Sequence, residues 1–277
     1  MAVTLPSSLF DRYPRFTLYN SPYAAHDDGC AIDLYPISGA PSPVEGEVVD
    51  VRTVRAPPKP YAPEHDHLIV IDDGTHLVRI LHVDPTVEIG EYVEEGEQLG
   101  NTVRAGFFAP WVDDHLHVGV RPRGSDPVRA SGSIRLRLPD DVHVTGLSWN
   151  GTGTVVETGD TYAVLDSPAH PAPGERFVGI AADDGGVLDG GVPHYDGGGL
   201  LGGASGPVRL LGTEIGTGDG RTVDWHDVTV VANGEPITGL SFFFARDGEF
   251  GAKLICPGHA FAIGDRVRVG FRSSTHD

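Results

Sequence analysis

The chain has 277 residues, which is enough for two ordinary domains or one large one whose core needs no disulfide framework. With 39% hydrophobic and 21% charged residues it has the composition of a folded globular protein, and its formal charge of −19 disfavours nucleic acid and anionic lipid as partners. No apolar run approaches the roughly 18 residues of a membrane helix, so we expect no membrane span.

The first residues lack the basic start, apolar segment and cleavage site of a secretory leader. We therefore expect a cytoplasmic protein, or an extracellular one if a leader has been removed. The positive charge is almost all arginine, because Lys59 and Lys253 are the only lysines. Together with the acidic balance this favours a halophilic, salt-adapted surface, and the alternative is an acidic composition without salt adaptation.

Short β-rich runs alternate with turn residues along the whole chain, which holds 38 Gly and 22 Pro. Long amphipathic helical periodicity is absent, so the sequence predicts an all-β protein. The predicted strands are Gly46–Val54, Leu68–Ile71, His76–Leu81, His115–Val120, Ile134–Leu138, Thr154–Glu157, Tyr162–Leu165, Val208–Leu211, Val228–Val231, Ser241–Ala245 and Arg266–Arg272.

The first segment with residues suited to metal binding or catalysis runs from Ala25 to Pro36, and it carries His26 and Asp33 around a short strand. A second group follows a proline-rich stretch and consists of the run Glu64-His65-Asp66-His67. Although this run also offers a His-x-His pair, its setting favours a solvated loop over a second metal site.

Three more histidines in the first half of the chain are candidate site residues. His82 stands alone at the end of an apolar strand, where by itself it would be a core or edge histidine. In His115-Leu116-His117 two imidazoles are separated by one residue, so both point to the same face of a strand. Such a pair suits a metal or catalytic site, and an exposed pair on an acidic surface is the alternative.

The order of these pieces resembles the lysostaphin-type zinc metallopeptidase domain over roughly residues 20–122. The resemblance implies a compact antiparallel β domain with zinc held by His26, Asp33 and His117, leaving one position for water, and with His82 and His115 beside that water. Family substrates are cell-wall peptide crosslinks. The motifs that carry the resemblance are His26 with Asp33, Gly39-Ala40-Pro41 with Val44-Glu45-Gly46-Glu47-Val48, Leu81-His82, the glycine-spaced stretch Val87–Gly100, and His115-Leu116-His117.

Two features depart from the family pattern. Asp33 follows His26 by seven residues instead of four, and we expect Asp27-Asp28-Gly29 to loop out. Asp113 and Asp114 stand where small residues or proline are usual.

The leading hypothesis is a zinc endopeptidase acting on short peptide links that contain Gly or Ala. The alternative is a peptidase-like binding or scaffolding module without activity. A biotinyl- or lipoyl-type carrier lacks the lysine it needs.

A domain boundary is expected within the Pro-, Gly- and Ser-rich stretch 121–133, which gives a peptidase-like domain of residues 1–132 and a β-rich, sandwich-like accessory domain of residues 133–277. Within the second domain, 183–206 holds ten glycines and predicts a flexible surface excursion. The aromatic residues Trp149, Trp225 and Phe242–Phe244 favour a core over a ligand platform. The sequence gives no indication of the purpose of this domain or of an oligomeric state.

Overall fold

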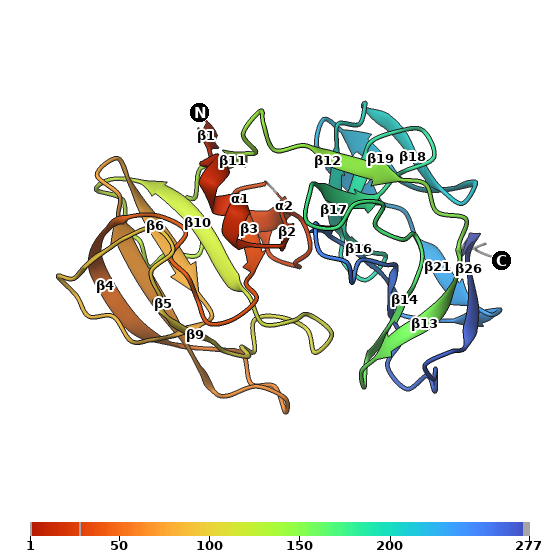
Figure 1. The fold of residues 1–277 in the computed structure, drawn as a ribbon, viewed down its shortest axis with the longest axis horizontal. Coiled ribbons are helices and arrows are strands. Elements are labelled where there is room, and N and C mark those ends of the chain that lie inside the picture. The colour runs from red at the N-terminus through yellow and green to blue at the C-terminus, as the bar shows by residue number, and fades with distance from the viewer. Residues whose placement is uncertain (1, 28, 274–277) are drawn as a thin grey trace. The chain divides into compact units, whose positions relative to one another are not determined.

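A computed structural model describes residues 2–27 and 29–273 and is built almost entirely of β-strands (Figure 1). Its helices in these residues are short, namely α1 (Ser7–Arg12) and α2 (Ala24–Asp27). The predicted all-β class is therefore confirmed. Within the described part of the chain, no helix has the length and hydrophobicity needed to cross a membrane.

The chain divides into two compact units. The first comprises residues 1–16 and 24–142, and the second comprises residues 17–23 and 143–277. The division thus lies between Val142 and His143, ten residues beyond the expected one. The reason is that the strand at 135–137 pairs in parallel with the strand at 2–4, with Ala2 opposite Arg135 and Thr4 opposite Arg137. This pairing keeps the segment after residue 132 with the first unit.

The sheet of the first unit contains the strand order β3-β10-β6-β5-β4-β8, and all of these neighbours are antiparallel (Figure 1). In β4 buried and exposed residues alternate from Gly46 to Val49, whereas the continuous apolar run Leu68–Ile71 lies buried in the middle of β5. The strands that begin in this unit are β1 (Ala2–Thr4), β2 (Arg15–Thr17), β3 (Ala31–Tyr35), β4 (Gly46–Arg55), β5 (His65–Asp72), β6 (His76–Leu81), β7 (Val83–Pro85), β8 (Tyr92–Val93), β9 (Gly100–Thr102), β10 (Leu116–Pro122) and β11 (Arg135–Arg137).

In the second unit, the described residues form a large sheet in the order β18-β19-β20-β17-β16-β23-β25-β14-β13-β26-β21-β22, and β12, β15 and β24 are neighbours in that order. Trp149 and Phe242–Phe244 are buried, and Trp225 packs partly buried against the core. The strands are β12 (Val144–Leu147), β13 (Thr152–Thr158), β14 (Tyr162–Leu165), β15 (Phe177–Ile180), β16 (Val187–Val192), β17 (Gly197–Leu201), β18 (Gly206–Leu210), β19 (Thr213–Asp219), β20 (Thr222–Trp225), β21 (Val228–Ala232), β22 (Glu235–Pro236), β23 (Gly239–Phe242), β24 (Phe244–Ala245), β25 (Lys253–Ile255) and β26 (Arg266–Ser273).

The glycine-rich stretch 183–206 is not a flexible excursion, so that prediction was wrong. Its residues form the antiparallel pair β16 and β17, and every residue of β16 is buried. The glycines leave space for aromatic rings: a Cβ atom on Gly198 would lie 2.2 Å from the Trp225 ring, and one on Gly199 would lie 2.2 Å from the Tyr19 ring. Here glycine serves close packing instead of mobility.

Candidate metal centre

Strand β10 lies between β3 and β6, and this order brings together segments that are far apart in the sequence. In the register of the two ladders, His117 lies opposite Asp33 of β3 on one side and opposite Leu81 of β6 on the other. His82 follows Leu81 directly. Cross-strand partners have neighbouring side chains, so the sheet places His117 beside Asp33 and close to His82.

His26 reaches the same place from the short helix α2, which precedes β3. After α2 the chain turns sharply: the N–H of Gly29 donates to the carbonyl of His26 at 2.8 Å, and Gly29 has a φ of +64°. A turn and a short helix thus occupy the seven-residue separation of His26 and Asp33. Of the segment expected to loop out, Asp28 lies outside the described residues.

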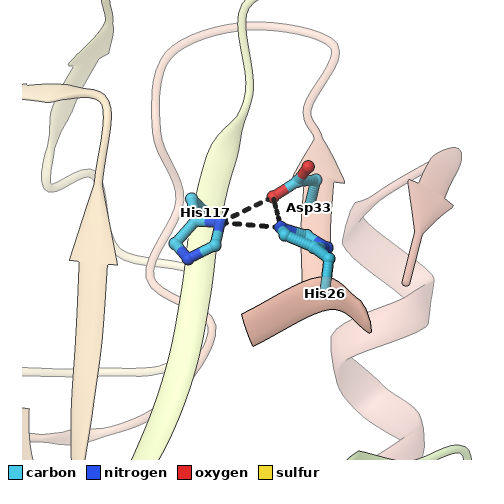
Figure 2. A group of neighbouring side chains, drawn as sticks. All are labelled: His26, Asp33 and His117. Atoms are coloured by element: carbon cyan, nitrogen blue, oxygen red, sulfur yellow. Dashed lines mark hydrogen bonds and ion pairs between the residues drawn. The ribbon is translucent and has the colours of Figure 1, made fainter. Parts of the chain in front are cut away.

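Three ligand atoms meet at this point (Figure 2). His26 Nε2 lies 3.3 Å from Asp33 Oδ1 and 3.1 Å from His117 Nδ1, and His117 Nδ1 lies 2.9 Å from Asp33 Oδ1. Four ligands at about 2.05 Å from a tetrahedral zinc ion would lie about 3.3 Å from one another. The observed spacing is close to that value, so the three side chains could hold a metal ion with one position left open.

The electrostatics of the group also suit a cation. Burial would raise the pKa of Asp33, but the neighbouring His26 and His115 and a hydrogen bond from His117 outweigh it and hold this pKa well below its usual value. Burial lowers the pKa of His117 to about 4, despite its hydrogen bond to Asp33. At neutral pH the group therefore combines a carboxylate with an uncharged imidazole, the states in which these residues bind metals.

The other two predicted histidines lie beside the three ligand atoms. His115 Nε2 is 3.6 Å from Asp33 Oδ2, and the ring of His82 is centred 5.0 Å from that of His115 and 5.9 Å from that of His117. Phe108 packs against both rings, and its ring is centred 5.1 Å from that of His82 and 4.7 Å from that of His115. All five residues predicted for the site are thus brought together.

His115 is held in a fixed orientation. Its Nδ1 lies 2.8 Å from the backbone carbonyl of Asp113, an acceptor, so Nδ1 carries the proton. Burial lowers the pKa of His115 to about 4. The two unusual acidic residues before it are paired with arginines, Asp113 with Arg15 at 2.5 Å and Asp114 with Arg104 at 3.2 Å. These ion pairs offset the extra negative charge beside the site.

Sequence reasoning missed one residue of this region, Asp66. The run 64–67 was expected to be a solvated loop, but β5 begins at His65 and Asp66 is fully buried. Asp66 Oδ2 lies 2.6 Å from Nδ1 of His82. The signal available in the sequence was the apolar run that begins at Leu68, but the proline-rich stretch before residue 64 concealed that the strand already starts at His65.

Comparison with known proteins relates both halves of the chain to one family. The model described as "Domain of unknown function (DUF8155) N-terminal domain" matches residues 4–138, and the model of the DUF8155 C-terminal domain matches residues 145–272. Each half of the chain therefore belongs to one domain of this family. No curated protein matches the sequence.

Two solved structures of lysostaphin are among those similar to the chain. The catalytic domain of the antimicrobial peptidase lysostaphin from Staphylococcus simulans is 20% identical, with 43% of this chain and 87% of that chain covered and a TM-score of 0.29. A solution structure of lysostaphin is 14% identical, with 90% of this chain and 98% of that chain covered and a TM-score of 0.28.

Proposed function

We propose that this DUF8155 protein is a zinc-dependent endopeptidase. The observation that carries the proposal is the buried group of His26, Asp33 and His117, whose ligand atoms have nearly the spacing of a tetrahedral zinc site with one position open. Two further imidazoles beside the group add the proton-transfer chemistry that peptide hydrolysis requires. The ordered motifs of the sequence support the same reaction.

A zinc ion held by the three residues would supply Lewis acidity toward a water molecule and a peptide carbonyl. The chain's own residues would move the protons. His82 and His115 both have Nδ1 engaged with an oxygen acceptor, so Nε2 is the nitrogen left to take a proton from the attacking water and return it to the leaving amine. Phe108 lies against both rings and limits the access of bulk water to them.

The proposed substrates are short peptide links that contain Gly or Ala. This substrate class follows from the resemblance of the motifs to the lysostaphin-type family, whose substrates are cell-wall peptide crosslinks. If the protein is cytoplasmic, its substrate would be another peptide with the same kind of link.

The first test is the metal content of protein purified without a His-tag. Wild-type protein is expected to hold one equivalent of zinc, and His117→Ala is expected to lose it, with affinity reduced more than about 100-fold because a direct ligand contributes more than an outer-shell partner. His115→Ala should keep most of the metal and lose turnover of Gly- and Ala-containing peptides. The control is His67→Ala, since His67 lies on β5 outside the ligand group. Wild-type protein without zinc would contradict the proposal.

A second candidate function is a peptidase-like binding or scaffolding module that hydrolyses nothing. The burial of the site favours it: His26 is fully buried, Asp33 and His115 are each 2% exposed, and of the His117 side chain only 15% is exposed. Stoichiometric zinc without hydrolysis of any peptide in a screen would support this module, whereas zinc-dependent cleavage that disappears in His115→Ala would exclude it.

A further inference from the structure

Asp66 makes an unusual set of contacts for a residue at the start of a strand. Its side chain is fully buried, and both of its oxygens are used. Oδ2 lies 2.6 Å from Nδ1 of His82, while Oδ1 accepts from the backbone N–H of His82 at 3.1 Å and from that of His67 at 2.7 Å. One carboxylate therefore holds both the ring and the backbone of His82.

The backbone of His82 needs such support. It has a φ of +70°, a left-handed conformation that is uncommon for residues with a side chain. This conformation interrupts the extended strand structure between β6, which ends at Leu81, and β7, which begins at Val83. The hydrogen bond from the His82 N–H to Asp66 fixes the irregular point, and the ring contact fixes the direction of the side chain that leaves it.

A buried carboxylate is costly unless it is paired and hydrogen-bonded. Asp66 is paired with an imidazole that packs against Phe108 and has His115 and His117 as neighbours. Because a carboxylate only accepts, it places the imidazole proton on Nδ1 and leaves Nε2 of His82 as the basic nitrogen. Asp66 does not belong to the group of possible metal ligands.

We propose that Asp66 is a positioning residue that sets the tautomer and orientation of His82 for proton transfer at the metal centre. The inference rests on the proposed hydrolytic function and extends it to a residue outside the ligand group. The competing explanation is a purely structural role, in which Asp66 only satisfies the two backbone N–H groups.

The substitution Asp66→Asn separates these roles. The asparagine oxygen can still accept from the two backbone N–H groups, but its amide then presents N–H to Nδ1 of His82 and moves the ring proton to Nε2. Nitrogen-15 NMR of the histidine rings, with His82→Gln to assign the signal, measures this tautomer without substrate. We expect protonated Nδ1 in the wild type and protonated Nε2 in Asp66→Asn.

The kinetic consequence is expected in kcat. Asp66→Asn should lower kcat by about 10²–10⁴-fold while KM and zinc content stay near the wild-type values, because the misplaced proton blocks transfer without removing a ligand. The matched control is Asp84→Asn, which makes the same change at an exposed carboxylate whose Oδ1 lies 3.8 Å from His67 Nε2. This control should leave kcat and the His82 tautomer unchanged.

Two results would overturn the inference. One is a wild-type His82 protonated on Nε2, a result that needs no measurement of activity. The other is an unchanged kcat in the Asp66→Asn variant, together with a loss of activity in the separate His82→Gln variant. This result would leave the proposed function intact. Wild-type protein that binds zinc but cleaves no peptide would instead contradict the proposed function. The tautomer of His82 would still be measured independently of that result.

Discussion

His194 shows how burial controls an imidazole in the second unit. Both ring nitrogens are buried, and the ring is centred 4.6 Å from that of Tyr195. Burial lowers the pKa of His194 to about 4, although a hydrogen bond with the backbone of Val192 opposes the shift. The native protein therefore resists protonation of this ring down to a lower pH than the unfolded chain, whose histidines titrate near 6.5.

This difference makes stability depend on pH with a definite sign. Between about pH 6.5 and 4 the unfolded state binds the proton that native His194 refuses, so the free energy of unfolding falls as pH falls through this window. His194→Gln removes the titration. We expect the loss of stability of the second unit between pH 7 and pH 4 to shrink by about 1–3 kcal/mol in this variant, as measured by urea unfolding.

The control for this prediction is His143→Gln, because His143 is exposed. An equal pH dependence in His194→Gln and wild type would show that His194 is protonated in the native state or contributes nothing to acid unfolding.

At the residue scale, the sequence predicts which histidines meet but not how each is held. The ligand group and the two neighbouring imidazoles were predicted through the resemblance of the ordered motifs to the lysostaphin-type domain, and not from the spacing of the histidines alone. The partner of His82 could not be found in that way, because Asp66 contacts it through an irregular backbone point at residue 82. Left-handed φ values of non-glycine residues leave no regular signature in the sequence.

At the scale of elements, glycine in β17 does the opposite of what composition suggests. Gly198 and Gly199 lie in a strand flanked by β16 and β20, and aromatic rings occupy the space that side chains would take. A strand rich in glycine loses more backbone entropy on folding than other strands. The buried faces of Tyr19 and Trp225 offset this cost through dispersion contacts and the removal of apolar surface from water.

Gly199→Ala tests this packing. The added Cβ would lie 2.2 Å from the Tyr19 ring, so the ring must shift, and we expect the free energy of unfolding to fall by about 1–3 kcal/mol. Gly270→Ala in β26 is the matched control, because its nearest neighbour would lie 3.8 Å away in ordinary contact, and a change within about 0.5 kcal/mol is expected. Equal effects of the two substitutions in denaturant unfolding would show that lost glycine flexibility, and not the aromatic ring, decides the outcome.

Strands with alternating or continuous apolar residues were predictable, as β4, β6, β14 and β21 show. Two kinds of strand were not. Short strands such as β7 and β8 carry too few residues for a period to emerge. The buried pair β16 and β17 has five glycines among its eleven residues, so no regular period of apolar side chains emerges and its own sequence resembles a linker.

At the scale of the whole molecule, charge is the dominant sequence property. The 39 acidic residues exceed the 20 basic ones, and the resulting charge of −19 repels itself in the compact state. Several arginines pair with carboxylates at the surface, including Arg55 with Glu64 at 3.3 Å and Arg209 with Asp184 at 2.9 Å. Exposed pairs of this kind contribute about 0–1 kcal/mol each, too little to offset the repulsion among the unpaired carboxylates.

Salt acts on these two terms in opposite directions, and the balance predicts the sign. Raising the ionic strength from about 0.1 M to 1 M shortens the Debye length from about 10 Å to 3 Å, which weakens the surface pairs but also screens the net repulsion. Because repulsion dominates, we propose a salt-adapted protein whose Tm rises by at least about 4 °C over this range, which corresponds to about 1–2 kcal/mol.

Thermal unfolding in potassium chloride measures this rise, and sucrose at matched water activity is the control, since it favours compact states without screening charge. If screening is the cause, the salt effect exceeds the sucrose effect and most of it develops where the Debye length still changes steeply, below about 1 M. A Tm that stays level or falls with salt would instead mean that the surface pairs matter more than the net charge, and the acidic composition would then carry no adaptation to salt.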